Sequence, residues 1–385
     1  MSNCYICEQE ILQSNTYNEH IQLNSLGGKL KSKDIICGSC APFFDLADAA
    51  LGKLLNPIAA QLNIDRDRGT PPPFEVDAVE RNGERYVLMP GGKPRLHIPI
   101  VNINGERIEI TVSDEQSLRK VLKGMKKKNP GLTNEAIELL IKGAEKLKEN
   151  IGEVEYSINL GDENLLRAIC KMAMSFYIYR DGDRENIAHL IPYIKGQEKP
   201  ENSCIGYYYP LSNKPYDYLQ EQGRVVHSLF VKGDPSQEKL YGLIQLFGNF
   251  RFLVLLNDNY HGEQFETSYT FDVLSREEIA ENLWEDFQLS SLEIQKISLS
   301  NIEENGRLES LFLNELESKM QTLQYFIIEK QLLDNFKLLN RETIEAEFKN
   351  ISEGEIVTDD CLRRIAEGCA ENLMVSLHDR NMLDN

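Results

Sequence analysis

The sequence predicts an α+β protein: a small zinc-stapled module comes first, a mixed region of helices and antiparallel strands follows, and the C-terminus is helical. Two C-x-x-C pairs lie within the first 40 residues. Further along, Asn-Gly turns join alternating polar and apolar runs, which is a strong hairpin signal. After residue 275, apolar residues recur at helical spacing. We therefore expect a module over 1–62, a linker over 63–74, an α+β regulatory or assembly domain over 75–274 and an acidic helical region over 275–385.

The paired cysteines indicate a structural zinc site. Each C-x-x-C turn places two thiolates side by side, and two such turns supply the four soft ligands of a closed tetrahedral zinc site. One pair alone would fit a redox dithiol equally well, whereas two pairs favour zinc. The expected zinc ligands are Cys4, Cys7, Cys37 and Cys40. The other cysteines lie in apolar or helical contexts and are expected to be ordinary thiols: Cys170, Cys204, Cys361 and Cys369.

Length and composition fit a globular protein of two or three domains. Of the 385 residues, 41% are hydrophobic and 8% are aromatic, which is too apolar for a disordered chain. No apolar run has the length of a membrane span, and no signal peptide precedes Cys4. We therefore expect a cytoplasmic protein without membrane contact, in a compartment where paired cysteines bind metal more often than they form disulfides.

The formal net charge of −19 argues against a protein that wraps long duplex DNA. The charge is unevenly spread along the chain. Residues 1–128 contain 17 Lys and Arg against 16 Asp and Glu, a net +1, so the remainder carries −20. The acidity therefore lies behind the zinc module, which is compatible with a protein that is kept off DNA until a partner or a signal activates it.

The stretch between the two cysteine pairs holds a candidate reactive dipeptide. Glu19 and His20 end a run that is typical of a strand, and a basic loop with two glycines follows. A short apolar strand at 35–36 then leads into the second cysteine pair. A helix begins near Pro42, because proline suits a first helical turn and apolar residues recur at helical spacing as far as Leu55.

This order of strand, loop, strand, cysteine knuckle and helix resembles the HNH endonuclease family, which is built on a ββα-metal unit. The similarity is to the branch that has two C-x-x-C knuckles around a Glu-His-Ile and a Leu-Gly-Gly motif. The matching positions are Cys4, Cys7, Glu19, His20, Ile21, Leu26, Gly27, Gly28, Leu30, Ser32, Lys33, Ile36, Cys37 and Cys40.

The resemblance implies metal-dependent hydrolysis of phosphodiester bonds in DNA, in bacterial defence against foreign DNA. His20 would be the general base that takes a proton from the attacking water. Glu19 matches a ligand position of a catalytic divalent ion, Mg²⁺ or Mn²⁺, which would stabilise charge on the scissile phosphate. Asp34 lies near the family's middle position, which braces the loop that carries the base.

Three lysines follow His20 in the loop: Lys29, Lys31 and Lys33. They are candidate phosphate contacts, which set affinity without reading the base sequence. A solvated loop explains any one of these lysines equally well. Phosphate contacts predict that DNA binding weakens steeply as salt rises, and salt-insensitive binding would count against them.

Two positions depart from the family's pattern. Leu23 stands where the family has proline, which affects only the stiffness of the loop. Ala41 stands where Asn or His lies close to the metal, and alanine cannot bind a metal. Three interpretations fit: a naturally weakened site, a replacement ligand at Asp45 or Asp48, or a deliberate Asn-to-Ala change that silences the site. The third is favoured, because the Glu-His pair and all four knuckle cysteines are retained.

The rest of the chain is predicted to alternate strands and helices. The helices that precede the second group of strands are expected to cover an antiparallel sheet. A long apolar stripe near the C-terminus needs a cover, from the protein itself, a second copy or another protein. The expected elements are strand hairpins within 76–88 and 97–112, helices at 114–128, 133–149 and 165–179, strands at 204–209, 225–231, 240–247, 250–256 and 265–274, and a helix or bent pair at 302–339.

Taken as a whole, the sequence predicts an HNH endonuclease whose partners are DNA and either a second copy or a sensor protein that licenses cutting. The alternative is a non-catalytic scaffold protein, in which the zinc module is only a fold and the acidic body docks a nucleic-acid-sensing partner. Ala41 favours this alternative, and the Glu19–His20 pair favours the enzyme. A zinc-binding transcription regulator is a weaker third option, because no basic recognition helix is evident.

Overall fold

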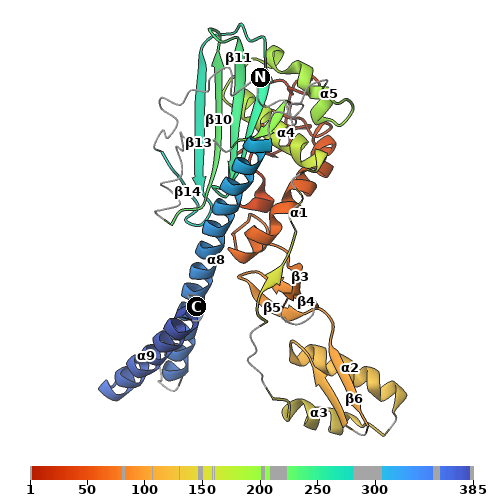
Figure 1. The fold of residues 1–385 in the computed structure, drawn as a ribbon, viewed down its shortest axis with the longest axis vertical. Helices are drawn as coiled ribbons and strands as arrows, with labels where there is room; N and C mark the ends of the chain where they lie inside the picture. The colour runs from red at the N-terminus through yellow and green to blue at the C-terminus, as the bar shows by residue number, and fades with distance from the viewer. Residues whose placement is uncertain are drawn as a thin grey trace. The chain divides into compact units, whose positions relative to one another are not determined.

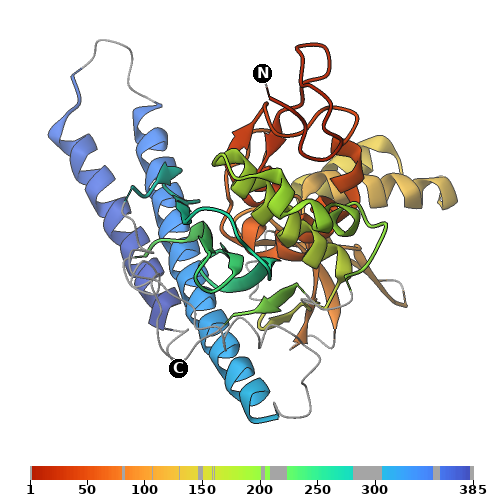
Figure 2. The same cartoon turned by 90° about the horizontal axis from the view of Figure 1, so that it is seen from above.

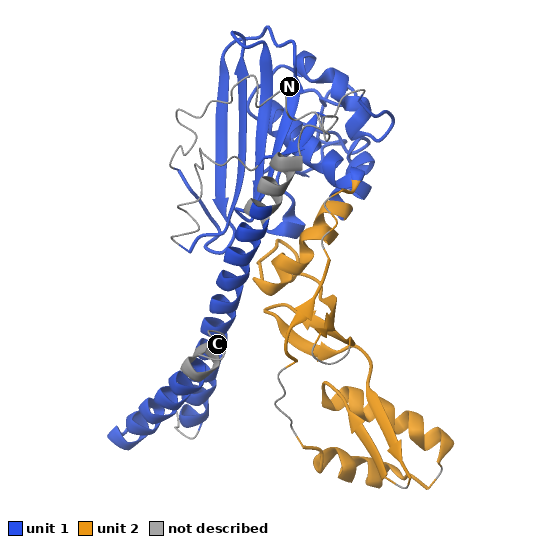
Figure 3. Cartoon of the chain, viewed as in Figure 1, with its two compact units in different colours: residues 1–49, 163–385 blue, residues 50–162 orange. Residues whose placement is uncertain are grey.

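The computed structural model divides the chain into two compact units. Unit 1 comprises residues 1–49 and 163–385, and unit 2 comprises residues 50–162 (Figure 3). Unit 1 is therefore discontinuous in sequence. The residues described are 2–79, 83–105, 107–129, 131–145, 151–157, 159, 161–200, 204–208, 223–280, 306–349 and 356–381.

The N-terminal module has the expected order of two strands and a helix, and the helix continues from unit 1 into unit 2. Strand β1 (Glu19–His20) pairs antiparallel with β2 (Lys31–Ser32). A 3₁₀ turn, η1 (Asn24–Leu26), lies between them. After the second knuckle, η2 (Ala41–Phe44) leads directly into helix α1 (Asp45–Gln61). The predicted ββα arrangement is confirmed.

A six-stranded antiparallel sheet forms the body of unit 1, in the order β14-β13-β10-β11-β12-β9 (Figure 1). All strands predicted between 204 and 274 are confirmed. A tight turn joins β11 to β12, with positive φ at Phe247 and Gly248. The strands are β9 (Ile205–Tyr207), β10 (Val226–Asp234), β11 (Lys239–Leu246), β12 (Phe250–Asn257), β13 (Phe265–Asp272) and β14 (Glu277–Glu278).

Helix α4 (Glu163–Tyr179) covers this sheet, packing on β10, β11 and β12. Most of its side chains from Ala168 to Tyr177 are buried, because one face meets the sheet and the other meets the N-terminal module. The expectation of an antiparallel sheet covered by a preceding helix is confirmed. Shorter helical turns follow α4: η4 (Arg184–Asn186), η5 (Ala188–Leu190) and α5 (Ile191–Ile194).

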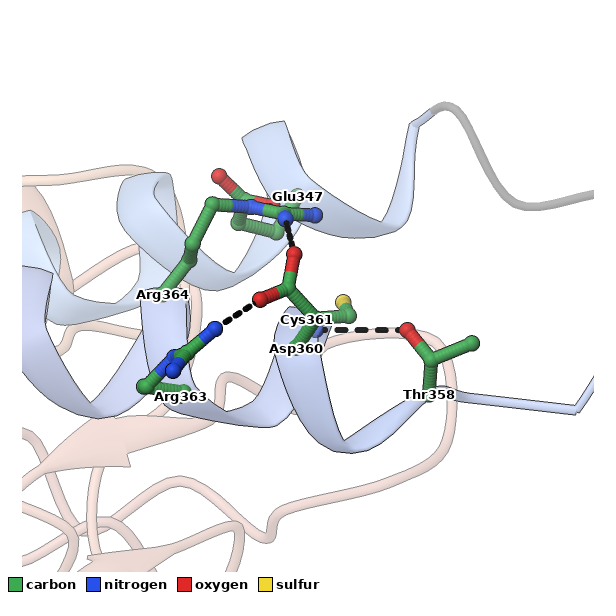
Figure 4. Close-up of polar contacts among 6 residues, drawn as sticks. All are labelled: Glu347, Thr358, Asp360, Cys361, Arg363 and Arg364. Carbon is green, nitrogen blue, oxygen red and sulfur yellow. Dashed lines mark hydrogen bonds and ion pairs between the residues drawn. The ribbon is translucent and has the colours of Figure 1, made fainter.

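The C-terminus forms a helical hairpin of α8 (Gly306–Phe348) and α9 (Asp359–Asn381), which lie side by side in both views (Figures 1 and 2). Thr358 caps α9 through its hydroxyl, which accepts a hydrogen bond from the Cys361 N–H at 3.3 Å (Figure 4). Arg364 of α9 donates to Glu347 of α8 at 2.8 Å. The predicted helical C-terminus is confirmed over α8 and α9, whereas its expected start at 275 is wrong, because residues 277–278 form strand β14 on the edge of the sheet. The expectation for residues 281–305, 350–355 and 382–385 lies outside the described residues.

The described residues of unit 2 form the greater part of α1, two small sheets and two further helices. The predicted hairpins are confirmed, with Gly105 at φ 64° in the turn between β6 and β7. Helices α2 and α3 pack against each other through Leu118, Leu122 and Ile137. The elements are β3 (Phe74–Ala78), β4 (Glu84–Met89), β5 (Lys93–Leu96), β6 (Ile100–Asn104), β7 (Arg107–Thr111), α2 (Glu115–Lys128), α3 (Asn134–Lys142) and β8 (Val154–Glu155).

Within the described part of the chain, no helix is both long enough and apolar enough to span a membrane. Whether residues 1–62 and 75–274 fold as separate domains, as the sequence predicts, stays a prediction.

Candidate functional site

The four paired cysteines converge on one point. Their sulfur atoms all lie within 4.8 Å of one another. A tetrahedral zinc ion with Zn–S bonds of about 2.3 Å would hold its sulfurs about 3.8 Å apart. The Sγ atoms of Cys7 and Cys37 are 3.7 Å apart, which matches this spacing. Among the described residues, this is the one group of three or more cysteine, histidine and acidic side chains that could hold a metal ion, and it is compatible with structural zinc.

Local backbone hydrogen bonds shape both knuckles. In the first, the Cys4 carbonyl accepts from the N–H of Glu8 at 2.8 Å, and Glu8 adopts a positive φ of 63°. In the second, the Cys37 carbonyl accepts from the N–H groups of Cys40 and Ala41 at 3.0 and 3.2 Å. These turns bring each C-x-x-C pair of sulfurs to the same side, as a metal knuckle requires.

His20 lies on β1 beside the basic loop. The antiparallel register places it opposite Lys31 on β2, and Glu19 opposite Ser32. The His20 side chain is partly exposed, whereas Lys31 is exposed. A partly exposed imidazole next to an exposed ammonium can meet a phosphate and an attacking water. Of the three predicted phosphate contacts, the structure thus pairs Lys31 most directly with the predicted base.

Within the loop between β1 and β2, Gly28 packs against Gln22. A Cβ at Gly28 would lie 2.5 Å from the Gln22 Cβ, so only glycine fits there. Gly27 caps η1 with φ 89°, a conformation that favours glycine. The Gln22 side chain is completely buried, and neither of its amide atoms has a hydrogen-bond partner among the described residues. Of the two glycines in the Leu-Gly-Gly motif, Gly27 therefore has a conformational role and Gly28 a steric one.

A histidine from the sheet forms a hydrogen bond to the same loop. His227 on β10 is 1% exposed. Its Nδ1 accepts from the Phe247 N–H at 3.1 Å, so the ring carries its proton on Nε2, which donates to the Leu26 carbonyl at 2.9 Å. Burial lowers the pKa of His227 to about 4, although the bond to Leu26 opposes the shift. The sheet thus holds the loop after His20 through a neutral imidazole.

Glu19 is held by a lysine from α4. The Lys171 side chain is 2% exposed, and its ammonium forms ion pairs with the carboxylates of Glu19 and Asp48, the latter at 3.0 Å. Burial lowers the pKa of Lys171, but the charges of Asp48 and Glu19 outweigh burial and hold that pKa above its ordinary value. Burial raises the pKa of Glu19, and the attraction of Lys171 offsets only part of the rise.

The other predicted site residues are more dispersed. Asp34 is exposed, and its backbone N–H donates to the Ser32 hydroxyl at 3.1 Å. Asp45 is exposed in the first turn of α1. Ala41 is 7% exposed and directly follows the second knuckle. Among the described residues, no group of three or more acidic, histidine or cysteine side chains brings Glu19 together with Asp45 or Asp34.

The residues around Glu19 do not fit the catalytic divalent ion that the family resemblance implies. Such an ion needs carboxylate oxygens free to coordinate it. In this structure the Glu19 carboxylate is paired with Lys171, and Ala41 offers no ligand atom. We therefore derive no step of a reaction through such an ion.

The fold of the N-terminal module is a ββα unit, and its four-cysteine cluster is compatible with structural zinc. Residues 4–56 match the family model of the HNH endonucleases. This match confirms the resemblance for the N-terminal module and implies a nucleic-acid substrate. No curated protein and no solved structure matched the chain.

Sequence reasoning missed Lys171 and the contact between His227 and the Leu26 carbonyl. Lys171 stands in the middle of an apolar helix, between Cys170 and Met172. A single lysine on a buried helix face needs an acidic partner, and this signal could have marked it. Nothing in the sequence could name that partner, because Asp48 is 123 positions away.

Proposed function

We propose that the N-terminal module is an HNH endonuclease that hydrolyses phosphodiester bonds in DNA. The observation that carries this proposal is the placement of His20, partly exposed on β1, inside the segment that matches the HNH endonuclease family. His20 acts as general base on the attacking water. Lys31, opposite His20, and its neighbours Lys29 and Lys33 contact the phosphates.

The resemblance also implies a divalent ion, Mg²⁺ or Mn²⁺, and the proposal includes this ion on the condition that Lys171 leaves Glu19. The ion needs Glu19, with Asp45 as the proposed second ligand, and in the described state Lys171 pairs with Glu19. Asp34 would brace the loop that carries the base. By analogy with the family, the proposal extends to defence against foreign DNA in the bacterial cytoplasm.

A non-catalytic scaffold is the second candidate, and two specific observations favour it. Ala41 offers no ligand atom, and the carboxylate next to His20 is already paired. In this alternative the zinc module is only a fold, and the acidic body docks a partner through the helical hairpin. Large apolar side chains are exposed along that hairpin, among them Tyr325, Leu333, Leu373 and Met374. In either case the proposed partner is a second copy or a nucleic-acid sensor.

Plasmid cleavage in the presence of Mg²⁺ or Mn²⁺ tests the choice. The chain itself is compared with Ala41→Asn and with Ala41→Asn combined with His20→Ala. The nuclease proposal expects Ala41→Asn to cut and the double variant to be inert. If all three are inert, alone and with candidate partners, and Ala41→Asn combined with Lys171→Met is inert as well, the scaffold function stands instead. Survival of infected cells that express the chain or His20→Ala tests the role in defence.

A further inference from the structure

A buried lysine lies where two acidic side chains of the N-terminal module converge. The ammonium of Lys171 pairs with Glu19, whose side chain is 5% exposed, and with Asp48, whose side chain is 29% exposed. We propose that this ammonium is the resident cation of the site and keeps a divalent ion away from Glu19. The proposal rests on the proposed function only in assigning Glu19 to a nuclease site.

Helix α4 holds the lysine firmly in this position. Ser175 lies one helical turn after Lys171, on the same face of α4. Its hydroxyl shares a 3.0 Å hydrogen bond with the hydroxyl of Tyr5 in the first knuckle. The Lys171 ammonium also lies 5.5 Å from the ring centroid of the buried Phe44. One face of α4 therefore contacts the zinc module at several points, so the ammonium is not a loosely placed surface charge.

A divalent ion and this ammonium cannot share Glu19. Mg²⁺ binds carboxylate oxygens at about 2.0–2.1 Å, and Mn²⁺ prefers similar oxygen ligands. The Lys171 Nζ already contacts a Glu19 oxygen, so a second cation on that carboxylate would meet a like charge at close range with little water between them. The metal therefore binds there only if Lys171 withdraws or loses its charge.

The two carboxylates form a cation site once the ammonium is removed. Lys171 supplies one positive charge against the two negative charges of Glu19 and Asp48, so this cluster of three side chains keeps a net negative charge. The Asp48 Oδ1 atom is buried and has no hydrogen-bond partner among the described residues. Carboxylate oxygens that have lost their ammonium partner are suitable ligands for Mg²⁺ or Mn²⁺.

Mn²⁺ binding to the zinc-loaded full-length chain tests the proposal, with free Mn²⁺ followed by electron paramagnetic resonance. Lys171→Met removes the charge while keeping most of the side-chain volume. Lys195→Met is the matched control, because Lys195 also lies over an aromatic ring of the module, 4.6 Å from the Phe43 centroid, without pairing with Glu19 or Asp48. Lys171→Met combined with Glu19→Gln removes the carboxylate as well.

We expect Lys171→Met to gain one Mn²⁺ site, at least about tenfold tighter than any site of the wild-type chain. The gain should be lost when Glu19→Gln is added, and Lys195→Met should match the wild type. Any weak Mn²⁺ binding elsewhere on the acidic chain is common to all variants, so these comparisons subtract it. Equal Mn²⁺ binding by Lys171→Met and the wild type would overturn the proposal.

A comparison that leaves Lys171 in place gives a second test, should Lys171→Met fail to fold. The Mn²⁺ isotherms of the wild type and of Glu19→Gln should superimpose, because Glu19 is not available to the ion. A wild-type site that disappears in Glu19→Gln would refute the proposal. Neither test measures DNA cleavage, so a chain that never cuts DNA would reject the proposed function while the Mn²⁺ result stays readable.

Discussion

Acidification should loosen the loop that follows His20, because His227 is buried in its neutral form. The unfolded chain protonates this histidine near its ordinary pKa of 6.5, whereas burial lowers the folded pKa to about 4. Above pH 6.5 the full stabilisation is present. As the pH falls from 6.5 towards 4, the unfolded state takes up a proton that the folded state refuses, so stability is lost.

The size of the loss follows from the pKa difference. Each pKa unit corresponds to about 1.4 kcal/mol. Between pH 7 and pH 5, this histidine alone should therefore lower the free energy of unfolding by about 2 kcal/mol. Other groups also titrate in this range, so the measured quantity is a difference between two proteins.

Urea unfolding at both pH values, in the wild type and in His227→Gln, provides that difference. Glutamine can still donate to the Leu26 carbonyl in place of Nε2, but it does not titrate. The wild type should lose about 2 kcal/mol more than His227→Gln on going from pH 7 to pH 5. Equal losses in the two proteins would refute the claim that the imidazole is held neutral between the sheet and the loop.

Three further predictions concern the module and its contacts. Removing zinc with a chelator should unfold the N-terminal module, since structural zinc contributes about 10 kcal/mol or more to such folds. Circular dichroism would detect the unfolding, and release of zinc by a thiol reagent would detect the metal. A chelated chain with unchanged stability would contradict the zinc site. Lys171→Leu should lower the free energy of unfolding by about 3–5 kcal/mol, because two carboxylates lose their buried partner; adding Glu19→Gln should restore part of the loss in denaturant unfolding. Gly28→Ala should destabilise the folded protein by about 1–3 kcal/mol, because the new Cβ would collide with Gln22. Gly124→Ala in α2, where nothing lies within 4 Å of the new Cβ, should stabilise it by about 0.5–1 kcal/mol. Equal shifts of the melting temperature in the two variants would count against the steric argument.

The parts of the fold that depend on local pattern were predictable from the sequence. Cysteine spacing alone predicts the cluster at Cys4, Cys7, Cys37 and Cys40, because each knuckle is a single turn. Alternation and Asn-Gly turns predict the hairpins of unit 2. The central strands of the large sheet are buried along almost their whole length, so short apolar runs predict them instead. Apolar residues at helical spacing predict helix α4, and the same signal predicts the helical C-terminus.

The contacts that complete the candidate site were not predictable, for a physical reason. His227 and Leu26 are 201 positions apart, and Lys171 and Asp48 are 123 apart. No local rule of propensity or periodicity reaches over such distances, because these pairings depend on how the sheet and α4 pack against the module. The sequence could identify Glu19 and His20 as reactive types, but not that Glu19 already has a buried partner.

The discontinuity of unit 1 has a consequence for the order of biosynthesis. The ribosome delivers the knuckles first and their packing partners on α4 and β10 much later, after the whole of unit 2. A nascent chain that ends before residue 163 can capture zinc with its four cysteines, yet it lacks Ser175, Lys171 and His227. Long-range contacts of this kind form slowly and late. During synthesis the module therefore exists for a time as a fragment that can bind metal but lacks its packing partners. At this stage its contact surface is exposed, so this is when we expect chaperones to bind it.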